Sequence, residues 1–215
     1  MARGGIEQTD ELLAYLSRYG ARTDAVLDRV KAETAELPSA AMQIAADQGA
    51  LMELLARLIN AKDALEVGTF TGYSAICIAR GLADGGRLTC LELDEEFAAT
   101  AQRNLEAASV ADRVEIRIGP AAQSLMAIPA EPAFDFAFID ADKPGYPAYY
   151  ELVLARMRPG GLVLLDNMLQ GGCVVAPDTE NARVVDALNR KIHADERVDM
   201  AMTISADGLT LVRVR

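Results

Sequence analysis

Two short acidic segments of this 215-residue chain each follow an apolar run. Asp140, Asp142 and Lys143 come after one run, and Asp166 and Asn167 come directly after the next. Runs this apolar are typical of strands that are buried on both faces of an α/β sheet. Because ligands of such sheets bind beyond the carboxyl ends of the strands, we expect these side chains to share a site. Three oxygen-bearing side chains with a lysine beside them indicate a hard-cation site.

Asp140, Asp166 and Asn167 offer only oxygen atoms as metal ligands. No His or Cys accompanies them, which disfavours zinc and favours Mg²⁺, with Mn²⁺ or Ca²⁺ as alternatives. Three protein oxygens would leave positions on the cation for water or a bidentate substrate. In an extended strand Asp166 and Asn167 would point to opposite sides, so both can ligate only if the chain turns there. The simpler alternative is a set of turn and helix-capping side chains.

Lys143 lies three residues after Asp140. Beside a cation and a developing phenolate, a lysine can take the hydroxyl proton or hold the oxyanion. The alternative for Lys143 is a surface ion pair with Asp142. Asp142 itself would support the metal from outside its ligand shell or face a cofactor.

A second candidate site lies in the segment LEVGTFTGYS, after the first apolar run. Gly68 and Gly72 allow a sharp turn and a close backbone approach to a ligand, and Ser74 stands near the start of the next helix. Glu92 ends the second apolar run, where an acidic side chain usually accepts hydrogen bonds from a ribose diol. Glu66 places an anion where a pyrophosphate would pass, which suits a cationic cofactor such as S-adenosylmethionine. The alternative is an ordinary glycine-containing turn.

The glycine spacing differs from the G-x-G-x-x-G of dinucleotide-binding folds. An NAD(P)-dependent oxidoreductase on a similar sheet is therefore the weaker hypothesis, and a non-catalytic protein that binds cofactor or metal is a third. The segment Gly119-Pro120-Ala121 either lies against a nucleoside base or simply starts a helix, and the two interpretations are compatible.

The elements that would position these residues alternate along the chain. Apolar runs predict strands at residues 64–67, 87–93, 113–118, 134–139 and 161–165, with helices that begin near Gly72, Asp94, Pro120 and Tyr146. This alternation predicts a parallel sheet with helices on both faces. A helix at residues 180–194 follows, and then strands at 198–204 and 209–214 flank a turn at Ala206-Asp207-Gly208. We expect an α/β fold with a mostly parallel seven-stranded sheet and a C-terminal antiparallel hairpin.

The first 60 residues predict helices at 10–19, 24–37 and 47–60. Leu51, Leu54, Leu55 and Leu58 in the third form an i, i+3, i+4, i+7 stripe. No repeat or linker divides the chain, so we expect a single domain over residues 1–215, with a helical segment at 1–60 and a core at 61–215.

The composition excludes several classes. A net charge of −11 without a basic patch disfavours nucleic-acid and anionic-membrane partners. The sequence shows neither a secretory signal nor an apolar stretch of about 18 residues that would span a membrane. Cys77, Cys90 and Cys173 have no metal-ligand spacing, and two of them lie in apolar elements, so we expect reduced thiols and a cytoplasmic protein. The lone histidine, His193, is expected on a solvated helix face.

Taken together, LEVGTFTGYS, FIDADK-x-x-Y and RPGGLVLLDN-x-L-x-x-G-x-V resemble the cation-dependent O-methyltransferases of the caffeoyl-CoA and catechol type, including small bacterial members. The resemblance runs from about residue 42 to the C-terminus. It implies a Rossmann-like class I methyltransferase fold with extra N-terminal helices that help form the acceptor pocket and a homodimer. It also implies S-adenosylmethionine and a divalent metal, normally Mg²⁺, as cofactors and a small phenolic molecule as acceptor.

The resemblance assigns roles to matching positions. The implied cofactor-binding residues are Ile44, Glu66, Gly68, Thr69, Ser74, Glu92, Ala121, Asp140 and Asp142. Asp140, Asp166 and Asn167 would hold the metal, Lys143 would be the general base or oxyanion holder, and Tyr149 and Gln170 would contact the acceptor.

Two departures bear on the acceptor. Gln170 stands where relatives often have Trp, which removes an aromatic wall, and the loop after Val174 is shorter than in plant enzymes. Both make caffeoyl-CoA itself a poor expectation. Ile44 stands where relatives often have Thr, so that only a backbone contact to the cofactor would survive.

Overall fold

The computed structural model describes residues 9–215, so the expectation about an N-terminal signal falls partly on residues outside the described chain. Seven strands form one sheet in the order β3-β2-β1-β4-β5-β7-β6. The pairs among β1 to β5 are parallel, whereas β7 is antiparallel to both β5 and β6. The strands are β1 (Asp63–Val67), β2 (Arg87–Glu92), β3 (Val114–Ile118), β4 (Phe134–Ile139), β5 (Met157–Leu165), β6 (Val198–Thr203) and β7 (Leu209–Val214). The predicted sheet with its C-terminal hairpin is confirmed.

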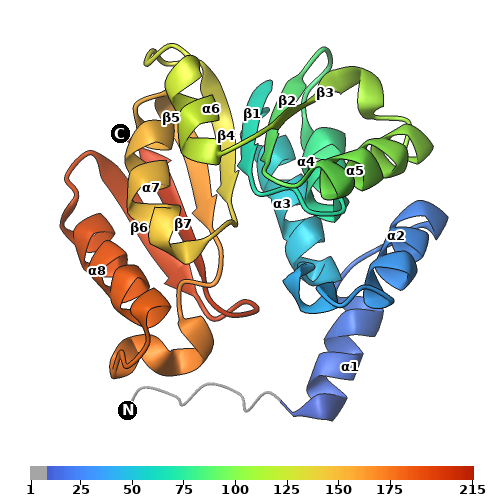
Figure 1. Cartoon of the computed structure of the whole chain (residues 1–215), viewed down its shortest axis with the longest axis horizontal. Helices are drawn as coiled ribbons and strands as arrows, with labels where there is room; N and C mark the ends of the chain where they lie inside the picture. Colours follow the sequence, from blue (N-terminus) through green and yellow to red (C-terminus); the bar gives the residue numbers. More distant parts are fainter. Residues whose placement is uncertain (1–8) are drawn as a thin grey trace.

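Helices surround this sheet, with α3, α4 and α5 on one side of the strands and α6, α7 and α8 on the other (Figure 1). The α-helices are α1 (Asp10–Tyr19), α2 (Ala25–Ala35), α3 (Ala46–Leu58), α4 (Tyr73–Gly81), α5 (Glu95–Ala107), α6 (Ala121–Ala127), α7 (Tyr146–Leu154) and α8 (Glu180–Ala194). Short 3₁₀ turns are η1 (Ala40–Met42), η2 (Ala111–Arg113), η3 (Lys143–Gly145) and η4 (Gln170–Val175). Side-chain oxygens of Thr9, Asp24, Asp94 and Thr179 cap four of the helices by accepting backbone N–H groups.

Two apolar clusters make up the core, one on each face of the sheet. Alternate strand residues divide between them: Leu65, Val67 and Ile139 face α6 to α8, whereas Phe136 and Phe138 face α2 to α5. This division explains why the central strands are continuously apolar, since both of their faces are covered.

Only part of the apolar stripe of α3 faces the core, where Leu51 and Leu55 pack against it. Leu54 and Leu58 are 53% and 70% exposed, whereas Met52 and Ala56 are fully buried. The face of α3 that packs on α4 includes the small residues Gly49 and Ala56 because the two helices approach closely. A Cβ atom on Gly49 would lie 2.9 Å from the Cys77 Sγ.

The structure confirms the expected positions of two buried cysteines and of the solvated histidine. Cys77 and Cys90 are buried free thiols, Cys173 is exposed, and His193 is exposed on α8. Within residues 9–215, no helix combines the length and the apolar character that crossing a membrane requires.

Candidate active site

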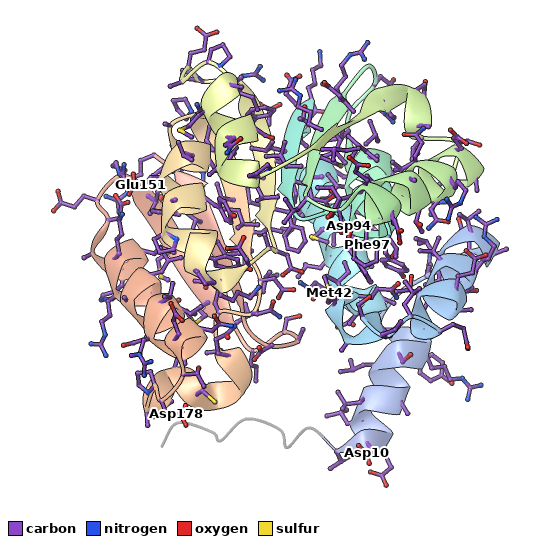
Figure 2. All side chains as sticks on the ribbon, viewed as in Figure 1. Asp10, Met42, Asp94, Phe97, Glu151 and Asp178 are labelled. Carbon is purple, nitrogen blue, oxygen red and sulfur yellow. The ribbon has the colours of Figure 1, made fainter. Side chains whose placement is uncertain are left out.

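A cavity of about 980 Å³ lies beyond the carboxyl ends of the parallel strands. Its walls come from the segment at residues 41–45, the loops after β1 to β5, and the β6–β7 turn. Three lining residues, Met42, Asp94 and Phe97, are labelled near the middle of the view in Figure 2. Ligand pockets commonly measure about 300–1,000 Å³, so this cavity can hold a cofactor together with a small second ligand.

The glycine loop after β1 forms one wall. Gly68 has a φ of 90°, and a Cβ atom there would overlap the Asp140 carbonyl oxygen, so only glycine fits. Gly72, with a φ of 88°, precedes α4 and packs against Ala101 of α5. The loop therefore brings the ends of β1 and β4 together, with Thr69 and Ser74 lining the cavity.

Glu66, at the end of β1, is fully buried and lies beneath the lining rather than in it. Its Oε2 accepts a hydrogen bond from the Cys90 Sγ at 3.3 Å, while its Oε1 has no partner. Burial raises the pKa of this carboxyl to about 7, although the neighbouring Ser74, Cys90 and Thr69 side chains act in the opposite direction. The site thus contains a buried carboxylate with spare hydrogen-bonding capacity.

Glu92, at the end of β2, is held by four backbone N–H groups. Its Oε2 accepts from Thr69 at 2.9 Å and Phe70 at 2.7 Å, and its Oε1 accepts from Leu93 at 2.9 Å and Asp94 at 3.0 Å. The carboxylate ties the glycine loop to β2 and still lines the cavity. Close by, the rings of Phe70 and Phe97 meet edge to face with centroids 4.7 Å apart.

The predicted metal-binding side chains meet at the ends of β4 and β5. Ile139 and Leu165 are register partners in the parallel pair, so Asp140 and Asp166 follow at the same edge of the sheet. Burial, and secondly the nearby Asp140 carboxylate, raise the pKa of Asp166 to about 6. A cation between the two carboxylates would relieve this repulsion.

Asn167 resolves the geometric difficulty seen in the sequence. Its φ of 55° turns the chain out of the strand, so that Asp166 and Asn167 both line the cavity. The Asn167 N–H donates to the Asp166 Oδ1 at 2.7 Å. Gln170, whose φ is 48°, donates its amide to the Asn167 carbonyl at 2.8 Å instead of lining the cavity.

Lys143 is 13% exposed, and its Nζ is surrounded by oxygen atoms. It donates to the Asp140 Oδ1 at 3.1 Å, the Ala141 carbonyl at 3.1 Å and the Tyr146 hydroxyl at 2.6 Å. These bonds use all three donors of an ammonium group. The fully buried Tyr146 hydroxyl lies within hydrogen-bonding distance of the Ile139 and Asp166 carbonyls, at 3.3 and 3.1 Å, and so connects the lysine to both strand ends.

Asp142 pairs with a tyrosine rather than with Lys143. Its Oδ1 accepts a hydrogen bond from the Tyr149 hydroxyl at 2.5 Å, and both residues line the cavity. Gly145 packs directly under the Tyr149 ring, where a Cβ atom would overlap the ring atoms. The surface ion pair between Lys143 and Asp142 that the sequence left open does not form.

The structure brings together most of the residues named from the sequence. The cavity lining includes Ile44, Gly68, Thr69, Ser74, Glu92, Ala121, Asp140, Asp142, Lys143, Tyr149, Asp166 and Asn167, but not Glu66 or Gln170. Sequence reasoning missed Gln48, Phe97 and the turn residues Ala206 and Asp207, which also line it. Gln48 carried no clear signal in the sequence, since its helix also contains the polar residues Asp47, Glu53 and Arg57.

The donor set fits a hard cation. Among the described residues, no group of three or more His, Cys, Asp and Glu side chains is placed to hold a metal ion. A cation here would therefore use two carboxylates and the Asn167 amide oxygen, with oxygen atoms of water or substrate completing its shell.

Comparisons with known proteins agree with one another. The sequence model of a family described as O-methyltransferase matches residues 17–215. A catechol O-methyltransferase of Niastella koreensis is 37% identical over 218 residues, which cover 97% of each chain. A caffeoyl-CoA O-methyltransferase of Eucalyptus gunnii is 33% identical over 219 residues, 96% of this chain and 88% of that protein. The crystal structure of an O-methyltransferase from Bacillus cereus with SAH has a TM-score of 0.86 and 36% identity, and the match covers 94% of this chain and 96% of that one.

Proposed function

This chain belongs to the O-methyltransferase family, and from that premise we propose that it methylates one hydroxyl of a small catechol-like acceptor. S-adenosylmethionine would be the methyl donor and a divalent cation, normally Mg²⁺, the second cofactor. The observation that carries the proposal is that Asp140, Asp166 and Lys143 meet in the same cavity that the glycine loop after β1 lines.

The cofactor end supports a cationic donor. The buried Glu66 carboxyl lies next to the lining residues Thr69 and Ser74, where a negative charge would favour a cationic donor over a pyrophosphate. Glu92 lies where a ribose would bind, and a ribose diol would share its carboxylate with the four backbone N–H groups. Ile44, Ala121 and Asp142 would complete this part of the pocket.

The same geometry disfavours a dinucleotide. In phosphate-binding loops, free backbone N–H groups after the first strand face the pyrophosphate. Here the N–H groups of Thr69 and Phe70 are already bound to Glu92. The loop therefore presents a carboxylate instead of free donors, which argues against an NAD(P)-dependent oxidoreductase.

At the other end, Asp140, Asp166 and Asn167 would hold the cation. When bound, it would lower the pKa of a coordinated phenol and orient both acceptor oxygens. Lys143 would then stabilise the resulting phenolate through the positive charge of its ammonium group, whose three N–H groups already bind protein oxygen atoms. To act as the base itself, Lys143 would first have to lose a proton and one of these bonds.

The acceptor oxygen would attack the methyl carbon as the carbon–sulfur bond breaks, so its proton must leave first, either to solvent or to a Lys143 that has itself lost a proton. Tyr149 is placed at the acceptor side by its bond to Asp142. Gln170 would act on the acceptor indirectly, by fixing the Asn167 carbonyl. Holding the two reacting atoms in line supplies much of the rate enhancement.

We also propose a homodimer. Apolar side chains of α1 and of the outer face of α3 are exposed, among them Leu13, Leu16, Tyr19, Leu54 and Leu58. A second copy would cover such a surface. The free thiols and the net charge of −11 fit a cytoplasmic protein without nucleic-acid or membrane partners.

The test is methyl transfer from labelled S-adenosylmethionine to a panel of phenols, with Mg²⁺ or with a chelator. Vicinal diphenols should be methylated, monophenols should not, and the chelator should abolish turnover until Mg²⁺ is restored. Turnover that a chelator leaves unchanged would refute the metal role. Failure to methylate any vicinal diphenol would refute the acceptor class.

A further inference from the structure

Gln48 is a buried amide that the protein itself leaves without a partner. It is the third residue of α3 and is 1% exposed, and neither its Nε2 nor its Oε1 forms a hydrogen bond. A glutamine at this helix position often reaches back to cap the preceding backbone N–H. Here it instead lines the cavity.

The unused amide is costly for folding. A buried polar group without a partner destabilises the folded state, and an apolar side chain of the same size would avoid this cost. The adjacent Gly49 packs tightly against Cys77 and Tyr73 of α4, so this turn of the helix is held firmly in place. Gln48 is therefore a rigidly presented donor and acceptor.

The neighbours of the amide in the cavity indicate its ligand. Gln48 lies beside Asp166, close enough to lower the pKa of that carboxyl, although the two side chains do not meet in hydrogen-bonding geometry. Lys143, in contrast, contacts Asp140 on the neighbouring strand end. The group next to Asp140, at the end of β4, is thus a cation, whereas the group next to Asp166, at the end of β5, is a neutral amide.

We propose that Gln48 binds the acceptor oxygen that is not methylated. The inference rests on the proposed function. The oxygen to be methylated lies next to Lys143, which stabilises its negative charge, so the second oxygen of a vicinal diol lies toward Asp166. There the Gln48 amide N–H donates a hydrogen bond to that oxygen, or the amide oxygen accepts a hydrogen bond from its hydroxyl group. Gln48 is thus a specificity-determining residue that distinguishes vicinal diphenols from monophenols.

This assignment predicts an uncommon combination of effects. A site that hydrogen-bonds a substrate hydroxyl discriminates strongly against analogues that lack it. Removing the amide should therefore weaken acceptor binding, while the protein without ligands should become no less stable. A residue with a purely structural role would show the reverse.

The experiment compares Gln48→Met and Gln48→Glu with Thr210→Val. Thr210 is fully buried in β7 with a partnerless Oγ1 and lies outside the cavity lining, so it is a matched control for the removal of an unused polar atom. The measurements are the melting temperature without ligands, the dissociation constant for S-adenosylmethionine, and the KM for catechol.

Both Gln48 variants should raise the KM for catechol at least tenfold, with cofactor affinity within twofold of wild type. The Gln48→Met and Thr210→Val proteins should melt no lower than wild type, and Thr210→Val should keep the wild-type KM. A Gln48→Met protein that melts several degrees lower with an unchanged KM would overturn the inference. If the wild-type enzyme methylates no vicinal diphenol, the proposed function itself fails, which this design shows separately.

Discussion

Replacing Glu66 by Gln should remove a pH-dependent loss of stability from the protein without ligands. The substitution keeps the size of the side chain and deletes its charge. Burial raises the pKa of Glu66 from the ordinary 4.5 to about 7, because a charge in this fully enclosed position loses its contact with water. The unpaired Oε1 has no donor in the protein that would compensate.

The sign and size follow from this difference. Because the folded protein binds the proton more tightly than the unfolded chain, the contribution of Glu66 is fully present below about pH 4.5 and is lost as the pH rises through about 7. At about 1.4 kcal/mol for each pKa unit, the loss amounts to about 3 kcal/mol. The glutamine that replaces Glu66 does not titrate, so the variant should not show this loss.

Urea unfolding of both proteins between pH 4.5 and 8.5 measures the effect. The free energy of unfolding of wild type minus that of Glu66→Gln should fall by about 3 kcal/mol over that range, since all other groups titrate in both proteins. S-adenosylmethionine should restore stability to wild type at pH 8 and do so less for the variant. A difference that stays flat from pH 4.5 to 8.5 would refute the assigned burial and charge.

Three further predictions concern the rest of the site and its scaffold. Asp140→Ala should abolish metal-dependent turnover but retain S-adenosylmethionine binding in calorimetry, and full activity would show that the ligand assignment is wrong. Tyr146→Phe removes the hydroxyl bound to Lys143, so kcat should fall about tenfold, the equivalent of one hydrogen bond. The dissociation constant for the cofactor should not change. A normal kcat would exclude a positioning role for Tyr146. Arg156→Met should destabilise the protein by about 2–4 kcal/mol in urea unfolding, because the buried guanidinium donates hydrogen bonds to the carbonyls of Ile128 and Leu152. A loss of stability below about 1 kcal/mol would contradict this account.

Element boundaries show how far local pattern determines the fold. The helix at Glu180–Ala194 and the strand at Leu209–Val214 have the predicted bounds. The second helix ends at Ala35 instead of residue 37, since a proline disfavours helical backbone in the residue before it, and the short turn η1 begins only after Pro38. Strand β5 starts at Met157, four residues before the predicted start, because its first part pairs across an irregular register with Phe134 of β4.

The α3 helix shows where a pattern alone misleads. A leucine stripe is typical of a core-facing surface, but Leu54 and Leu58 are largely exposed. The requirement for close packing on α4 selected Gly49 and Ala56 for the inner face, and periodicity contains no information about how near the neighbouring helix lies.

The sequence by itself determined the sheet, its switch to an antiparallel hairpin, and the chemistry at its carboxyl edge. This was possible because apolar runs, glycines and strand-end carboxylates are local signals, and parallel strands bring their ends to one edge. Only the tertiary structure decided that Asp142 pairs with Tyr149, that Tyr146 holds Lys143, and that Gln48 lies unpaired beside Asp166. Those relations join residues through the packing of separate elements, and side-chain direction in a packed core depends on every neighbour at once.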